Sequence, residues 1–251
     1  MLTVKKSLGQ HFLKDEQVLE KITAILKERP FERLLEVGPG GGALTRYLIQ
    51  IPDIELTCVE LDHEKVDHLL RNYPRLRGHI MEADILAIDK PFDKPFTLIG
   101  NFPYNISTQI VFRVLEWKSS VETMIGMFQK EVAQRIAAPS GSKVYGVTSV
   151  LVQAFFKVDF LFEVDQNAFT PPPKVKSAVI RLTPREKIPL MKNERFFINL
   201  VKTAFNQRRK TLRNAVRSLF DEETLEQDIF NKRAEQLTVE DFAALSFEMK
   251  Q

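Results

Sequence analysis

The sequence predicts an α/β protein with a doubly wound sheet, followed by a small domain that is all-helical. Between residues 34 and 182, short apolar runs rich in β-forming residues alternate with amphipathic stretches of helical spacing. A glycine-rich turn follows the first apolar run, at the place where such folds bind nucleotides. Beyond residue 189 the spacing of apolar residues becomes helical throughout. A length of 251 residues allows one large domain and a small appendage.

The individual elements follow from the same pattern. Residues 34–37 form the first predicted strand, and a helix with Leu44, Tyr47 and Leu48 on one face follows its glycine turn. Further strands are expected at 54–60, 79–81, 96–100 and 121–128, and helices at 64–70, 107–115 and 147–153. Residues 155–162 and 177–182 are expected to form an antiparallel pair.

A change of character marks the end of the large domain. The stretch 183–189 contains Pro184 and Pro189 among several charges and is typical of a linker. We therefore expect one domain over residues 1–187 and a second over 188–251. Residues 194–219 are expected to be helical, with Phe196 and Leu200 on one face.

Composition places the chain among ordinary soluble proteins. Its residues are 44% apolar and 27% charged, and no stretch approaches the length of a membrane span or of a signal peptide. The single cysteine, Cys58, lies in an apolar strand, which excludes a disulfide framework and indicates a reducing, cytoplasmic location. No apolar stripe is left over for a dimer, so we expect a monomer.

Positive charge is concentrated in one segment although the net charge is only +3. Such a local excess indicates a polyanionic partner, although a solvated helix face gives the same pattern. Against the single acid Glu194, residues 192–217 contain Lys192, Arg195, Lys202, Arg208, Arg209, Lys210, Arg213 and Arg217.

The glycine turn has the pattern Glu36-x-Gly38-x-Gly40-x-Gly42, which lets a ligand approach the backbone closely. A dinucleotide site prefers a third glycine where Ala43 stands, but alanine is sometimes tolerated there, so the glycines alone do not exclude NAD.

Two carboxylates favour S-adenosylmethionine over NAD. Glu60 ends the second strand, where it can accept hydrogen bonds from both ribose hydroxyls. Asp84 follows the third strand, where it can accept from the exocyclic amine of an adenine. Each could singly be a surface carboxylate at a strand end. Together, and with no Lys or Arg in the glycine turn, they predict a Rossmann-like sheet of the class I methyltransferase type.

The turn Asn101-Phe102-Pro103-Tyr104 follows the fourth strand and offers an amide, a rigid backbone and an aromatic face. The Asn101 side-chain oxygen and the Pro103 carbonyl can accept both N–H groups of an adenine N6 amine, and Tyr104 can stack on the ring. Alone, the same residues could be a turn with a packed tyrosine.

These motifs resemble those of the rRNA small subunit adenine dimethyltransferases, which make two adjacent N6,N6-dimethyladenosines near the 3′ end of 16S rRNA. The resemblance extends over almost the whole chain. Two positions differ from the common family pattern: His11, where Asn is common, and Phe102, where the family has Leu. The matching segments are 6–13, 36–42, 59–62, 83–86, 101–104, 169–175, 205–212 and 233–237.

The resemblance implies roles for individual residues. The cofactor residues it implies, taken with the glycine turn, are His11, Leu13, Gly38, Gly40, Glu60, Asp84 and Asn101. The residues expected to hold and orient the target base are Asn101, Pro103, Tyr104 and Phe169, although Phe169 could instead belong to the core. The residues expected to bind RNA within the small subunit are Lys5, Lys6, Lys202, Arg208, Arg209, Lys210 and Arg213. No metal is required, because the leaving group of the transfer is a neutral thioether.

Three other functions remain open. A 23S rRNA methyltransferase of the macrolide-resistance type shares the cofactor half, but the motifs at 205–212 and 233–237 argue against it. A dehydrogenase would need a catalytic His or a Tyr-Lys arrangement, and none stands out among four histidines. A non-catalytic ribosome assembly factor could keep the fold, but the intact Asn101–Tyr104 turn speaks against a loss of chemistry.

Overall fold

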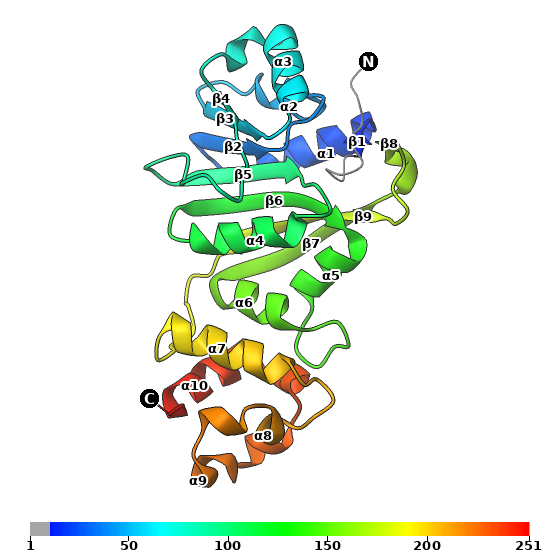
Figure 1. Ribbon diagram of the computed structural model, residues 1–251. Helices are drawn as coiled ribbons and strands as arrows, with labels where there is room; N and C mark the ends of the chain where they lie inside the picture. The colour runs from blue at the N-terminus through cyan, green and yellow to red at the C-terminus, as the bar shows by residue number, and fades with distance from the viewer. Residues whose placement is uncertain (1–10, 251) are drawn as a thin grey trace. The chain divides into compact units, whose positions relative to one another are not determined.

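A seven-stranded sheet is the frame of the computed structural model, which describes residues 11–250 (Figure 1). In spatial order the strands are β4 (Ile80–Glu82), β3 (Glu55–Glu60), β2 (Arg33–Val37), β5 (Phe96–Asn101), β6 (Val121–Gln129), β9 (Ser177–Pro184) and β7 (Phe156–Val164). The pairings β4–β3, β3–β2, β2–β5 and β5–β6 are parallel, whereas β9 runs antiparallel to β6. This arrangement confirms the predicted doubly wound α/β class.

Strand order decides where a ligand can bind. The chain moves outward from β2 through β3 to β4, and then returns to the other side of β2 with β5. A crevice forms at such a switch point, outside the carboxyl ends of the strands. The carboxyl ends of β2, β3 and β5 carry Gly38, Glu60 and Asn101, so the expected site residues meet at one edge of the sheet.

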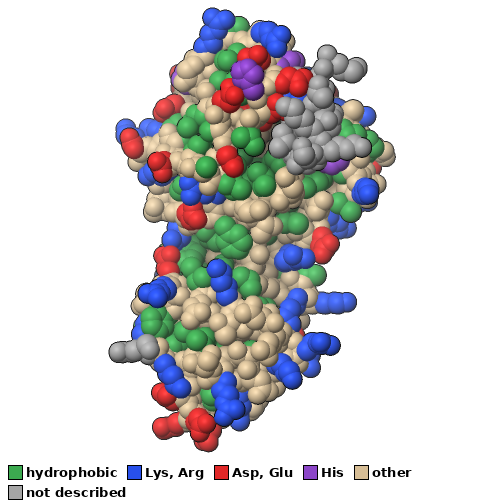
Figure 2. Space-filling model, viewed as in Figure 1, with side chains coloured by type: hydrophobic (Ala, Val, Ile, Leu, Met, Phe, Trp, Pro, Cys, Tyr) green, Lys and Arg blue, Asp and Glu red, His purple; other side chains and the backbone are tan. Residues whose placement is uncertain are grey.

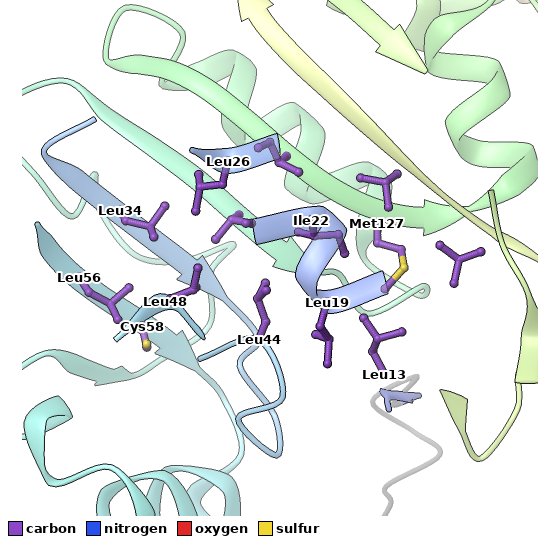
Figure 3. Close-up of a cluster of buried hydrophobic side chains, with 14 of the residues drawn as sticks. Leu13, Leu19, Ile22, Leu26, Leu34, Leu44, Leu48, Leu56, Cys58 and Met127 are labelled. Atoms are coloured by element: carbon purple, nitrogen blue, oxygen red, sulfur yellow. The ribbon is translucent and has the colours of Figure 1, made fainter. Parts of the chain in front are cut away.

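Helices cover both faces of the sheet, with α1 and α2 on one face and α4 on the other (Figures 1 and 3). The first of them, α1, is an addition to the sequence prediction, and the Asp15 side chain caps its start by accepting a hydrogen bond from the Val18 N–H. The bounds are α1 (Glu16–Leu26), α2 (Thr45–Leu48), α3 (His63–Asn72), α4 (Ser107–Glu116), α5 (Lys130–Ala137) and α6 (Val147–Phe155).

The core beneath α1 is built from side chains at helical spacing. Leu19, Ile22 and Leu26 are all buried and point toward the sheet, where they meet Leu34 of β2 and Leu48 of α2 (Figure 3). Burying each such side chain contributes roughly 1.5–3 kcal/mol. This packing holds α1 next to the carboxyl ends of the strands, which places the residues that precede it beside the site.

Those preceding residues form a small second sheet. The strand β1 (Phe12–Leu13) pairs antiparallel with β8 (Phe169–Thr170), and the Lys14 N–H donates to the Ala168 carbonyl at 2.8 Å. The segment around residue 12 and the proline-rich segment that starts at residue 169 therefore lie side by side.

The chain divides into two compact units. One contains the residues up to 133 together with 159–184, and the other contains 134–158 together with the residues from 185 onward. The second unit thus begins close to the expected boundary at 187, but it also takes α6 from the middle of the chain. The division into an enzymatic domain over 1–187 and an RNA-binding domain over 188–251 stays a prediction.

The second unit is helical. Its α6 packs against α7 and α10, and the Phe205 ring lies near the rings of Tyr145 and Phe242, at centroid distances of 6.0 and 5.8 Å. Its later helices are α7 (Glu194–Phe205), α8 (Leu212–Ala215), α9 (Glu222–Leu225) and α10 (Val239–Glu248), with short 3₁₀ helices at Arg217–Leu219, Asp228–Asn231 and Ala234–Gln236.

The prediction of continuous helix over residues 194–219 was wrong. The helix α7 ends at Phe205, and residues 206–210 form an exposed turn before α8 begins at Leu212. Nothing between Phe205 and Leu212 is apolar, so a helix there would bury no side chain to offset the cost of ordering the backbone. Within residues 11–250, no helix is both long and apolar enough to cross a membrane.

A buried carboxyl group lies under the glycine turn. The Glu36 side chain is in the sheet, where it accepts a hydrogen bond from Thr45 Oγ1 at 2.8 Å and lies 3.6 Å from Cys58 Sγ. Burial is the main cause that raises the pKa of Glu36 to about 7, and the two hydrogen bonds oppose it. The residue is therefore partly protonated near neutral pH.

The raised pKa of Glu36 predicts a pH-dependent stability. A carboxyl group whose pKa is higher in the folded chain contributes most below its unfolded pKa, and that contribution is lost as the pH rises through about 7. A shift of this size corresponds to roughly 3 kcal/mol. We expect the Glu36→Gln variant to lack this part of the decline in the free energy of unfolding between about pH 5 and 8. Urea titrations at several pH values measure that free energy. The matched control is Glu122→Gln, at an exposed position of β6, which should keep the wild-type pH dependence.

Candidate active site

A cavity of about 490 Å³ lies at the carboxyl ends of β2, β3, β4 and β5. Five of the segments that line it each carry at least one predicted site residue. These segments are residues 11–14, 36–44, 59–61, 83–86 and 100–106. The volume suits a small organic ligand of nucleoside size.

The glycine turn forms one wall and needs its glycines for space as well as for conformation. Gly40 and Gly42 have φ angles of +55° and +84°, in the left-handed region that side chains disfavour. A Cβ atom on Gly40 would lie 3.0 Å from the Phe12 ring, and one on Gly42 would lie 2.6 Å from the Tyr73 ring. Gly38 also has a positive φ and lines the cavity. The turn thus packs closely against the rings of Phe12 and Tyr73.

Glu60 links that turn to the end of β3. Its Oε2 accepts the Gly40 N–H at 3.0 Å, and its Oε1 accepts the Asp62 N–H at 3.0 Å. Burial raises the pKa of Glu60, while the backbone hydrogen bonds oppose the rise. Each oxygen keeps a further lone pair, so the carboxylate can still accept hydrogen bonds from a ligand in the cavity.

Asp84 stands on the neighbouring wall, directly after β4. Its Oδ1 accepts the Leu86 N–H at 2.9 Å, which fixes the side chain in a local turn. The Ala83 N–H donates to the Glu60 carbonyl at 3.0 Å. This backbone pairing joins the strand ends that carry the two acidic residues, and both residues line the same cavity.

The Asn101–Tyr104 turn forms the opposite wall and is anchored by its second residue. The Phe102 side chain is buried and meets the Phe128 ring edge-on at 5.2 Å. Its ring fits because Gly126 has no side chain: a Cβ atom there would lie 2.3 Å from Phe102. The buried Phe102 ring therefore anchors the turn in the core.

The polar groups of the turn have defined partners. Tyr104 Oη lies 2.5 Å from Ser177 Oγ, and burial raises the pKa of Tyr104. The Pro103 carbonyl accepts the Ile106 N–H at 3.2 Å and keeps a second lone pair. Asn101 Nδ2 donates to the His11 carbonyl at 2.9 Å. His11, Asn101, Pro103 and Tyr104 all line the cavity, and their roles in binding stay predictions.

Phe169 lies elsewhere. Its side chain is 1% exposed and belongs to the hydrophobic core, and it does not line the cavity. Leu13, its neighbour in the β1–β8 pair, is 5% exposed but reaches the cavity wall. Phe169 therefore lies in the core, as the alternative interpretation expected. Its role in binding the target base stays a prediction.

The sequence analysis missed two charged residues that line the cavity, Glu16 and Arg46, and a buried ion pair next to it in the chain. Glu16 lies at the start of α1, where it forms an ion pair with Arg46 and a 2.5 Å hydrogen bond with Tyr47. Lys65 and Asp62 form a fully buried ion pair at 3.8 Å, and Lys65 Nζ lies 5.5 Å from the Phe12 ring centre. The i,i+3 spacing of Asp62 and Lys65 was a usable signal, whereas the Glu16–Arg46 contact depends on tertiary structure.

The predicted RNA-binding residues of the second unit differ in their surroundings. Lys202, Arg209 and Lys210 are exposed, and Arg213 is half-buried. Arg208 is committed to the protein, because its Nη2 donates to the carbonyls of Lys143 and Tyr145 at 2.9 and 3.1 Å. Figure 2 shows Lys and Arg side chains over the surface of the C-terminal helices. Lys5 and Lys6 lie outside the described residues.

Comparison with known proteins agrees with this geometry. Residues 1–251 match the family model described as ribosomal RNA adenine dimethylase. The chain is 49% identical to the ribosomal RNA small subunit methyltransferase A of Flavobacterium johnsoniae, over 96% of this chain and 94% of the relative. It is 51% identical to the protein of that name from Phocaeicola vulgatus, over 96% of this chain and 88% of the relative.

Solved structures show the same architecture. A dimethyladenosine transferase from Plasmodium falciparum superposes with a TM-score of 0.80 at 24% identity, covering 95% of this chain and 99% of that one. The 23S rRNA methyltransferase ErmE superposes with a TM-score of 0.69 at 26% identity, covering 96% and 100%. The fold, the cavity and the family model together show that the chain belongs to the ribosomal RNA adenine dimethylase family and is a methyltransferase of rRNA adenine.

Proposed function

We propose that the chain transfers methyl groups from S-adenosylmethionine to N6 of two adjacent adenosines in the 3′-terminal hairpin loop of 16S rRNA, giving N6,N6-dimethyladenosine. The substrate is the RNA within the small ribosomal subunit, met in the cytoplasm by a monomeric enzyme. The observation that carries this proposal is the Asn101–Tyr104 turn, which lines one cavity together with Glu60 and Asp84.

The cavity residues fit S-adenosylmethionine. Glu60 would accept hydrogen bonds from the ribose hydroxyls, and Asp84 would accept one from the adenine amine. Ile85 and Leu86 supply apolar surface for the adenine ring. The turn from Gly38 to Ala43 has no Lys or Arg for a pyrophosphate, which argues against a dinucleotide. When bound, the cofactor supplies a methyl group on a positively charged sulfur.

The role of the chain is to prepare the nitrogen that receives the methyl group. The lone pair of an adenine N6 amine is delocalised into the ring, so the amine is a poor nucleophile. Asn101 Oδ1 and the Pro103 carbonyl would accept its two N–H groups, which favours a pyramidal nitrogen and directs the lone pair. Orientation of this kind can contribute roughly 7–11 kcal/mol. The nitrogen bonds to the methyl carbon as the sulfur–carbon bond breaks, and the surplus proton leaves afterwards to water.

Tyr104 would hold the target base by stacking, worth about 1–3 kcal/mol per base. Removing an adenine from a hairpin loop costs only a few kcal/mol, so stacking and the two hydrogen bonds can offset it. The second transfer uses an amine with one remaining N–H, so one of the two acceptors loses its partner. Phe169 could contribute to base binding only if its segment left the core, where it is 1% exposed.

The test of the proposed function is methyl transfer from S-adenosylmethionine to unmethylated small subunits, with digestion of the RNA and mass spectrometry of the nucleosides. We expect N6,N6-dimethyladenosine in 16S rRNA. Transfer to 23S rRNA alone would assign the chain to the resistance type, and transfer to neither RNA would leave a binding protein on a methyltransferase fold.

Replacement of Asn101 tests the proposed chemistry. We expect Asn101→Ala to lower kcat by about 10²-fold or more, comparable to the removal of one preorganised hydrogen-bonding group. The dissociation constant for S-adenosylmethionine should change little, measured by calorimetry. The control Asn72→Ala, at the exposed end of α3, should behave as the wild type. Near-normal turnover of Asn101→Ala would contradict the role.

The exposed basic turn predicts a salt-dependent affinity for small subunits. Removing Arg209 and Lys210 together should weaken binding and reduce the slope of log K against log salt by about two, since each phosphate contact contributes roughly one. Arg75→Ala, which removes an exposed charge from the first unit, is the control and should leave the slope unchanged. A double variant with the wild-type slope would show that this turn is only a solvated surface.

A further inference from the structure

The residue His11 touches three parts of the active site at once. Its backbone carbonyl accepts a hydrogen bond from Asn101 Nδ2 at 2.9 Å. Its imidazole Nδ1 lies 2.9 Å from the Pro171 carbonyl, and its ring stacks on Tyr104 with a centroid distance of 5.3 Å and an interplanar angle of 29°. The half-buried side chain therefore joins the Asn101–Tyr104 turn to the proline-rich segment.

The hydrogen bond to the His11 carbonyl decides how the Asn101 amide is turned. A carbonyl oxygen can only accept, so the amide presents its NH₂ group to residue 11 and its oxygen Oδ1 points away. The proposed reaction needs this orientation, because Oδ1 must accept an N–H of the target amine. The reverse orientation would place NH₂ against NH₂, which gives no hydrogen bond and repels the substrate.

The imidazole keeps that carbonyl in place. Because the Pro171 carbonyl only accepts, His11 Nδ1 carries the hydrogen in this contact. Immediately after residue 11, β1 pairs with β8, with Phe12 opposite Thr170. The side chain thus extends the β1–β8 pairing by one further link, up to the residue whose carbonyl Asn101 uses.

We propose that His11 is a positioning residue for the methyl transfer: it turns the Asn101 amide so that its oxygen faces the target amine, and it supports one face of Tyr104. This inference rests on the proposed function. It assigns His11 to the base side of the site, whereas the resemblance alone implied a contact with the cofactor.

Two substitutions separate the effect of the His11–Pro171 hydrogen bond from the effect of side-chain size. His11→Leu keeps a side chain of moderate size but has no donor for Pro171. His11→Asn keeps a donor, because its Nδ2 is attached to Cγ just as the imidazole Nδ1 is. We expect His11→Leu to lower kcat by about 10- to 100-fold, the effect of a misplacement near 1 Å, and His11→Asn to recover most of it. The KM for small subunits and the dissociation constant for S-adenosylmethionine should change little in both.

The opposite kinetic result would overturn the inference. If His11→Leu weakened S-adenosylmethionine binding and left kcat unchanged, His11 would be a cofactor contact. If His11→Asn lost as much kcat as His11→Leu, the Pro171 anchor would have no role. Thermal unfolding of each variant checks that the fold is intact, and His11→Ala replaces His11→Leu should the latter fail to fold.

A second readout works in the free protein and needs no methyl transfer. Asparagine labelled with ¹⁵N gives side-chain amide signals by NMR, and the Asn101→Ser variant identifies the signal of residue 101. We expect slow solvent exchange of this amide in the wild type and in His11→Asn, and fast exchange in His11→Leu. Slow exchange in His11→Leu would overturn the inference. A wild type without methyl transfer but with this exchange pattern would refute the proposed function and keep the orientation of Asn101.

Discussion

The parallel pairing of β3, β2 and β5 is the constraint on which the rest of the site depends. Its register sets Val37 opposite Val59 and Glu36 opposite both Cys58 and Ile99, so the strands end at nearly the same level. The glycine turn, Glu60 and the Asn101–Tyr104 turn follow directly from those ends. A slip of one residue in this pairing would exchange the side chains of the two faces of the sheet and separate the groups that line the cavity.

Buried polar groups then fix the loops that the sheet brings together. Glu60 is almost fully buried, yet both of its oxygens accept backbone N–H groups, one from the glycine turn and one from the start of α3. Glu36 holds Thr45 at the start of α2 by accepting a hydrogen bond from its side-chain hydroxyl. Burial disfavours the charged forms of both acids, and each raised pKa reflects that cost. The rigid loops that result suit catalysis by orientation, where small displacements carry large losses of rate.

Much of the fold could be predicted because its signals are local. The strands at 34–37, 54–60 and 96–100 combine apolar runs with clear turn residues, and the structure has strands there. The helix break after Phe205 was missed, since the basic turn has helix-forming residues and only the lack of a buried face stops it. Phe169 shows the same limit: its sequence neighbours do not reveal that the β1–β8 pairing leaves it in the core.

By itself, the sequence determined the fold class, the order of the strand-end motifs and the chemistry that those motifs offer. Such features depend on spacing along the chain and on residue type, which the sequence contains directly. Only the tertiary structure decided which groups meet across long separations: His11 with Pro171, Asn101 with the carbonyl of residue 11, and Arg208 with the loop at Lys143. Hydrogen-bond partners of this kind follow from packing in three dimensions, because a single donor has many acceptors along the chain and only the folded arrangement selects one.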